Sequence, residues 1–260
     1  MCAMDLTLPH RNHAGMETGL LVIIGVVFFA AGIVKGVSGM GLPTFSMALL
    51  GMVMSPIAAA ALMVLPSLAT NFSQCAGPHG RDLARRLWPM WLGLALATVF
   101  ASLPDLSASR SVARITLGVV LMAYGLWGLI KPELPGFGKH TLTVGCLVGA
   151  LSGLLTAATG VFVMPMVPYL QSLRLTREEL IQALGLSFTV ATLALTIRLG
   201  NMGVAAAAAD IGAVVIAVLT AFLGLAVGTR LRHCLQPRWF QLALYGVFLL
   251  LGLAMVGRSV

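Results

Sequence analysis

The stretch GIVKGVSGMGLPTFSMALLG (residues 32–51) interrupts a long hydrophobic tract with one lysine and a cluster of glycines. The glycines permit a tight, non-helical backbone, and Pro43 suits the first turn of a helix that follows. The stretch therefore predicts a helical hairpin whose second helix begins inside an apolar region. Lys35 would place a positive charge beside the N-terminus of that helix.

The composition assigns the chain to a membrane. Of its 260 residues, 59% are hydrophobic and 9% are charged, whereas a soluble domain carries roughly a quarter charged residues. The apolar runs are long and continuous, which indicates helical spans rather than the alternating segments of about ten residues found in membrane β-barrels. We expect an all-α integral membrane protein. Most of its basic residues lie in connectors, so orientation in the bilayer explains them better than nucleic-acid binding does.

The apolar runs form ten segments, in two sets of five. An internal repeat supports this division, because residues 32–50 align with GALSGLLTAATGVFVMPMV (149–167) at a constant offset of 117. We expect a polar tail over 1–16, a first transmembrane repeat over 17–135 and a second over 136–260, together one membrane domain. The expected segments cover 18–35, 41–53, 56–76, 87–103, 111–130, 141–157, 160–172, 178–198, 205–228 and 238–257.

Charge counting predicts that the two halves are inverted. The second and seventh segments, with about 13 residues each, reach only about 20 Å as helices, short of the roughly 30 Å hydrocarbon core. If each hairpin enters and leaves on one side, each half crosses the membrane an odd number of times. Ten basic residues then lie on one side and five on the other, which places the richer side in the cytoplasm and both termini outside. Re-entrant hairpins and fully spanning ones satisfy the count equally. The richer side comprises the loops 77–87, 131–140, 173–179 and 229–238.

The first hairpin has the features of an anion site. Free backbone N–H groups and the positive end of the helix dipole would face the turn, and Lys35 would add a full charge. An ionisable residue at membrane depth is by default a functional candidate. Two other readings remain open, namely a lysine that snorkels to an interface and a close helix crossing at the small residues.

The second hairpin, SGLLTAATG (152–160), offers Ser152 at the position of Lys35, together with Thr156 and Thr159. Hydroxyls and amides bind an oxyanion without adding charge, although threonines also bond back to their own helix. Further polar groups follow each hairpin and must face the bundle interior or a cavity, as ligand contacts or as contacts between helices. They are Ser67, Thr70 and Asn71 in the first half and Gln182, Ser187 and Thr189 in the second.

Enzyme chemistry finds little support. None of the five histidines belongs to a metal-ligand motif, and the chain has no GxSxG, no P-loop and no carboxylate pair expected to face one cavity. We expect no catalytic residues, no metal and no cofactor. Asp210 lies only some five residues from a helix start, so an interfacial position is the better reading for it than proton coupling.

The two small-residue hairpins, each in one half of a chain of about 260 residues, resemble the TauE/SafE family of sulfite-exporter-like permeases. The resemblance covers about 17–257 and is carried by GIVKGVSGMGLP. It implies a multi-pass secondary transporter of small anions, typically sulfite or organosulfonates, in the inner (cytoplasmic) membrane. Both halves depart from the family's glycine run, since residues 39–43 read GMGLP and residues 156–160 read TAATG.

From the residues and the resemblance together we expect an anion bound near the midplane between the two hairpin turns, and alternating access by rocking of one half against the other. The partners are then the anion and the bilayer, with a homodimer left open and no nucleic acid. The alternatives are a channel or uniporter for a neutral or cationic solute and a scaffold that transports nothing. The expected binding residues are Lys35, Gly36, Ser38, Gly39, Gly41, Thr44, Asn71, Ser152, Thr156, Thr159, Gly160 and Ser187.

Overall fold

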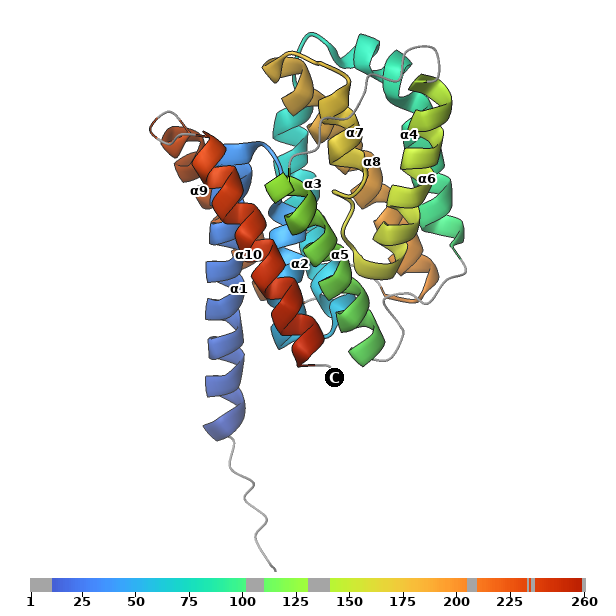
Figure 1. The fold of residues 1–260 in the computed structure, drawn as a ribbon. Helices are drawn as coiled ribbons and strands as arrows, with labels where there is room; N and C mark the ends of the chain where they lie inside the picture. Colours follow the sequence, from blue (N-terminus) through green and yellow to red (C-terminus); the bar gives the residue numbers. More distant parts are fainter. Residues whose placement is uncertain are drawn as a thin grey trace, which may run out of the picture.

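A computed structural model describes residues 11–101, 110–130, 141–204, 210–232, 234 and 237–258. Ten helices and no strand occur in these ranges, in a single bundle (Figure 1). The helices are α1 (Arg11–Ser38), α2 (Leu42–Val53), α3 (Pro56–Cys75), α4 (Gly80–Phe100), α5 (Arg110–Ile130), α6 (Thr141–Thr159), α7 (Met166–Ser172), α8 (Arg177–Asn201), α9 (Ile211–Leu231) and α10 (Pro237–Gly257).

Seven helices are long and apolar enough to cross a bilayer: α1, α3, α5, α6, α8, α9 and α10. The expected all-α membrane fold is thereby confirmed. α4 is as long as α5, at 21 residues, but its first turns carry four charged side chains, the last of them Arg86. α2 has 12 residues and reaches about 18 Å, so it is the short helix that the sequence predicts.

The second short helix differs from its prediction. Helical structure was expected from residue 160, but α7 begins at Met166 and has only seven residues. Pro165 explains the delay, because proline lacks an N–H and disfavours helical backbone in the residue before it. The helix at 205–228 also begins later than expected, at Ile211, with residues 205–209 outside the described part of the chain.

The helix contacts repeat when the two halves are exchanged. α1 packs against α9, and its counterpart α6 packs in the same way against α4. Equivalent helices also pack on each other, α3 on α8 and α5 on α10, and the contact of α4 with α8 has its counterpart in that of α9 with α3. α5 and α10 lie side by side (Figure 1) and are antiparallel, because Gly118 lies against Gly252 whereas Gly125 lies against Tyr245.

Three connections that the charge count placed on one side do lie together. Gln182 near the start of α8 bonds the loop after α3, and Arg86 of α4 donates to the carbonyl of Leu173 after α7. Arg232, after α9, lines a pocket with His79. We call this end of the bundle the His79 end. The fourth loop, 131–140, lies outside the described residues.

Several arginines donate hydrogen bonds to the last carbonyls of helices other than their own. The last carbonyls of a helix have no intrahelical donor and carry the negative end of its dipole, and in a membrane an unpaired carbonyl is costly. These basic residues therefore also stabilise helix ends. The arginine donors are Arg232 to Gly36 and Val37, Arg114 to Gly51 and Met52, Arg198 to Thr98 and Ala101, and Arg86 to Leu173.

α1 and α9 cross at glycines, with backbones in direct contact. A methyl group at Gly224 would lie 2.1 Å from the carbonyl oxygen of Phe29, and one at Gly228 would lie 2.4 Å from that of Ile33. Small residues at such crossings are the usual solution where lipid replaces water as the solvent. The crossing positions the last turn of α1, which carries Lys35.

We predict that Gly224→Ala destabilises the protein by about 1–3 kcal/mol, because the methyl group forces the two backbones apart. The matched control is Gly246→Ala, since nothing lies within 4 Å of a methyl group there. That control gains helix propensity and should be neutral or stabilising, by up to about 1 kcal/mol. Thermal unfolding of both variants in detergent measures the difference, and equal melting temperatures would contradict the predicted close crossing.

Candidate anion site around Lys35

Lys35 lies in the last turn of α1 and is fully buried. Its ammonium donates to the hydroxyl oxygen of Thr70, at 3.0 Å, and to the amide oxygen Oδ1 of Asn71. Both acceptors are on α3, so the lysine joins the first hairpin to the following helix. Its place at the C-terminus of α1 is also favourable to the helix dipole. The snorkelling alternative is wrong, because the side chain does not reach an exposed surface.

The bonds around Lys35 leave hydrogen-bond donors unused. The hydroxyl of Thr70 donates its proton to the carbonyl of Pro66, at 2.7 Å, and its lone pair is then free to accept from the lysine. Asn71 turns its amide oxygen to the ammonium, which directs the Nδ2 group elsewhere. Nδ2 is buried and has no hydrogen-bond partner among the described residues. Asn71 thus presents N–H donors to the protein interior.

No carboxylate compensates the lysine. The one ion pair found in the described part of the chain joins His79 Nδ1 and Glu179 Oε1, at 4.0 Å and at the protein surface. Thr70 and Asn71 are neutral acceptors, so they solvate the ammonium without cancelling its charge. A buried charge without a counterion is strongly unfavourable, and an anion bound here would remove that cost.

Two more unused hydroxyls accompany the lysine. Thr44 Oγ1 in the first turn of α2 and Ser67 Oγ on α3 are buried and lack a partner among the described residues. Ser67 precedes Asn71 by four residues, so both lie on one face of α3. Leaving a buried donor unpaired costs about 1–3 kcal/mol. Several such groups near one uncompensated cation are the pattern of an anion site.

The first hairpin turn has the backbone that its glycines predict. Gly39 (φ 79°) and Gly41 (φ 100°) are in the left-handed region, and Gly41 caps α2 without any side-chain hydrogen bond. The amides of Leu42 and Thr44 are therefore among those that a helix leaves without an intrahelical acceptor. Ser38 is engaged elsewhere, because its hydroxyl bonds the carbonyls of Val34 and Met40 at 2.7 and 2.8 Å.

Gly36 has a packing role instead of a place in the turn. A methyl group on it would lie 2.7 Å from Cα of Gly228, so it belongs to the crossing of α1 with α9. The reading of a close helix crossing at small residues is thus right for Gly36, while Lys35, one position earlier, points to α3. The two readings of this stretch apply to adjacent residues.

The two hairpin turns contact different parts of α3. In the first turn, the carbonyl of Gly39 accepts from Gln74 Nε2, in the C-terminal part of that helix, at 2.9 Å. Gly160 of the second turn packs on Ala60, near the start of the same helix, and on Met47 of α2. Met47 lies six residues after Gly41, which is about 9 Å along a helix. An anion bound between the two turns stays a prediction.

The second turn also offers fewer free donors. Thr156 and Thr159 donate to the carbonyls of their own helix at Ser152 and Leu155, both at 2.7 Å. The amide of Gly160 donates to Thr156, at 2.8 Å. Ser152 keeps a buried hydroxyl without a partner among the described residues. Both threonines therefore bond back to their own helix, which is one of the two roles that the sequence left open for them.

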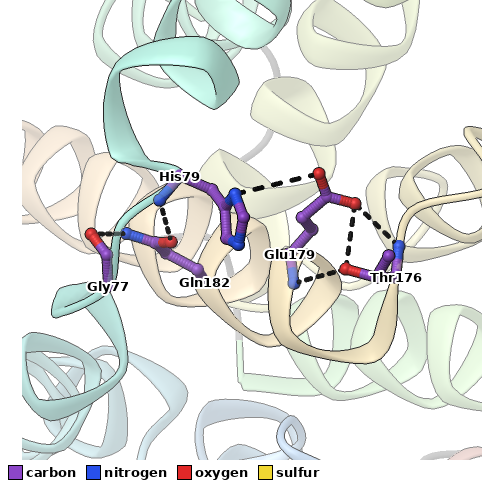
Figure 2. A network of polar contacts seen from close by, with 5 residues as sticks. All are labelled: Gly77, His79, Thr176, Glu179 and Gln182. Atoms are coloured by element: carbon purple, nitrogen blue, oxygen red, sulfur yellow. Dashed lines mark hydrogen bonds and ion pairs between the residues drawn. The ribbon is translucent and has the colours of Figure 1, made fainter.

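The polar groups of α8 bond other helices. Ser187 accepts from the indole nitrogen of Trp91 at 2.9 Å, which joins α8 to α4. Gln182 donates to the carbonyls of Cys75 and Gly77 and accepts from the amide of His79, so it holds the loop after α3 (Figure 2). Asp210 is exposed and caps α9 by accepting from the Gly212 amide at 3.1 Å.

A pocket of about 380 Å³ at the His79 end reaches to within one helical turn of the lysine site. Its wall includes Gln74, three residues after Asn71 on α3. Gln74 also donates to the carbonyl of Gly39, so it joins the pocket wall to the first hairpin turn. Sequence reasoning missed Gln74, although its spacing from Asn71 places it on the same helix face, and it missed Arg232, for which the sequence carries no signal beyond charge.

We predict that Asn71→Leu lowers stability by about 1–3 kcal/mol, because the buried ammonium loses an acceptor. In a Lys35→Met background the same change should cost less than about 1 kcal/mol, so the two residues couple. Thermal unfolding in detergent of the single and double variants measures the coupling. Asn201→Leu, at an exposed position in the chain, is the matched control and should leave the melting temperature unchanged. Additive effects of the two site changes would rule out the bond.

Comparison with known proteins gives one family. The family model described as "Sulfite exporter TauE/SafE" matches residues 24–255. Neither a curated protein nor a solved structure matches the chain.

Proposed function

The chain belongs to the sulfite exporter TauE/SafE family, a family of membrane permeases, and we propose that it is a secondary transporter of a small anion, sulfite or an organosulfonate. The family consists of transporters rather than enzymes, and the seven apolar helices are those of a multi-pass membrane protein. We further propose alternating access as the mechanism and the cytoplasmic membrane as the location.

One observation carries the proposal of an anion: Lys35 is fully buried and has no carboxylate partner among the described residues. A cationic substrate would add a second positive charge to a group that already lacks a counterion. A neutral solute would leave that charge uncompensated. An oxyanion supplies the missing charge, and its several oxygens match a site rich in donors.

The proposed binding mode uses the donors that the protein leaves unpaired. The lysine has three N–H bonds, of which Thr70 and Asn71 take two. The third N–H of the lysine remains available. Together with Asn71 Nδ2 and the hydroxyls of Thr44 and Ser67, it gives a set of donors on α1, α2 and α3. The uncapped start of α2 adds the positive end of a helix dipole. These donors place the proposed anion beside the first hairpin turn, in the first half of the chain.

Access to this site is proposed to alternate by movement of one repeat against the other, with repeats over 17–135 and 136–260. The antiparallel packing of the equivalent helices α5 and α10 supports an inverted relation, because the operation that exchanges them reverses helix direction. Gln74 of the pocket wall is bonded to Gly39 of the first turn. Opening toward the His79 end requires that bond to break.

We predict that Lys35→Ala abolishes saturable anion flux while the protein stays folded, and that Lys35→Arg retains part of it, because arginine keeps the charge but not the geometry. Asn71→Asp should also abolish flux, since an aspartate beside Lys35 supplies the counterion internally. The measurement is efflux of radiolabelled sulfite, sulfate and a short alkylsulfonate from proteoliposomes under imposed pH gradients.

Arg85→Ala is the matched control, because it removes an exposed cation from α4 and should leave flux unchanged. Anion flux that survives Lys35→Ala would overturn the site. Flux of a neutral or cationic solute alone would favour a uniporter or channel, and the absence of any flux would favour a scaffold without transport.

A further inference from the structure

The pocket at the His79 end has the chemistry of a second anion site. It lies between the C-terminal part of α3, the start of α8 and the end of α9, and its volume is about 380 Å³. The surface of the wall is mostly apolar, and its polar side chains include Gln74, Gln182, Thr229 and Arg232. Gly39 and the last turn of α1 adjoin it through the bonds of Gln74 and Arg232.

Arg232 is the cation of this pocket. Its Nε donates to the carbonyls of Gly36 and Val37, at 2.9 and 3.1 Å. This leaves the two terminal nitrogens of the guanidinium without a hydrogen bond to the described residues, and no carboxylate lies within ion-pair distance of it. Burial lowers the pKa of Arg232, and the nearby charge of Arg177 lowers it further. Arg232 therefore has free N–H donors and no counterion among the described residues.

The other groups of the pocket are engaged or compensated. Both ends of the Gln182 amide bond the loop after α3, and His79 faces Glu179, which is itself held by Thr176 (Figure 2). The hydroxyl of Thr229 donates to its own helix. Glu178 also lines the pocket, and its carboxylate repels anions. Arg232 therefore offers the strongest free donors in the wall.

We propose that this pocket binds a small oxyanion group through the terminal nitrogens of Arg232, as a site separate from Lys35. A guanidinium presents two parallel N–H bonds that fit an oxyanion in a bidentate manner. The inference rests on the proposed anion transport, in which the anion binds in this pocket before it reaches Lys35. Because Nε of Arg232 holds the last turn of α1, an anion that draws the guanidinium into the pocket also loosens the helix end next to Lys35.

Cysteine protection tests the site without measuring transport. Thr229→Cys is placed in a chain whose four native cysteines are replaced by alanine, and its labelling by N-ethylmaleimide is followed in proteoliposomes of neutral lipid. Methanesulfonate is the probe, because it carries the oxyanion group and does not react with the label. We expect it to slow labelling in a saturable way. Arg232→Gln should raise the half-protecting concentration about tenfold or more.

Arg230→Gln is the matched control, because it removes the same charge from an exposed position two residues away and should leave protection unchanged. Lys35→Ala should also leave it unchanged, so the inference and the proposed function can fail separately. Arg232→Lys, which keeps the charge, should restore part of the protection if Arg232→Gln disturbs the end of α1. Protection that is equal in Arg232→Gln and Arg230→Gln, or no protection at all, would overturn the site.

The phosphate of an anionic lipid carries the same chemistry as a free oxyanion. A parallel set of liposomes with phosphatidylglycerol separates the two sources. Protection by methanesulfonate in neutral lipid supports a free anion on the path to Lys35. Protection by phosphatidylglycerol alone would assign the pocket to a lipid headgroup and overturn its place on that path.

Discussion

The bond between the Lys35 ammonium and the Asn71 amide oxygen organises the first half of the protein. A lysine without a counterion is costly in a buried site, so its neutral acceptors join the last turn of α1 to α3, a helix that α1 otherwise hardly contacts. They also decide the orientation of the asparagine, whose N–H donors then face the interior unpaired. The same bond therefore stabilises the fold and prepares the proposed anion site.

Close helix crossings make this arrangement possible. The glycines of α1 and α9 bring two backbones into contact, and this crossing fixes the position of the last turn of α1 against α9. Arg232, after α9, donates to the carbonyl of Gly36 in that turn, and Gln74 of α3 donates to the carbonyl of Gly39 just after it. In a membrane these carbonyls have no water to bond. The hairpin turn is thus held by side chains from α3 and α9, and movement of either helix would be transmitted to Lys35.

The two halves share an architecture but differ in chemistry. Their helix contacts are equivalent, yet Ser152 stands where the first half has Lys35, and the threonines that follow bond their own helix. The second half also has the shorter helix after its turn, because Pro165 delays the start of α7. One charged site and one neutral counterpart are the result. The repeat provides two equivalent sets of helices that can move against each other. Lysine at position 35, where the second half has Ser152, provides the charge.

Much of the fold follows from the sequence alone. Apolar runs longer than a bilayer core require helices, since only helices and closed barrels satisfy the backbone in lipid, and the glycines at 39 and 41 indicate the turn before α2. The short length of α2 and the gathering of three basic loops at one end were likewise predictable from length and charge. Lys35 was recognisable as a candidate because a lone charge in an apolar tract is rare.

Only the tertiary structure decided which residues meet. Alignment of the hairpins indicated their equivalence but not their contacts, which are with Gln74 of α3 for the first turn and with Met47 of α2 and Ala60 of α3 for the second. Gly36 and Lys35 are neighbours in the sequence, yet the helix directs one to α9 and the other to α3. The partners of Lys35 and Arg232 are 35 and 196 residues away from them in the chain. Local patterns do not encode such contacts, because they depend on how whole helices pack.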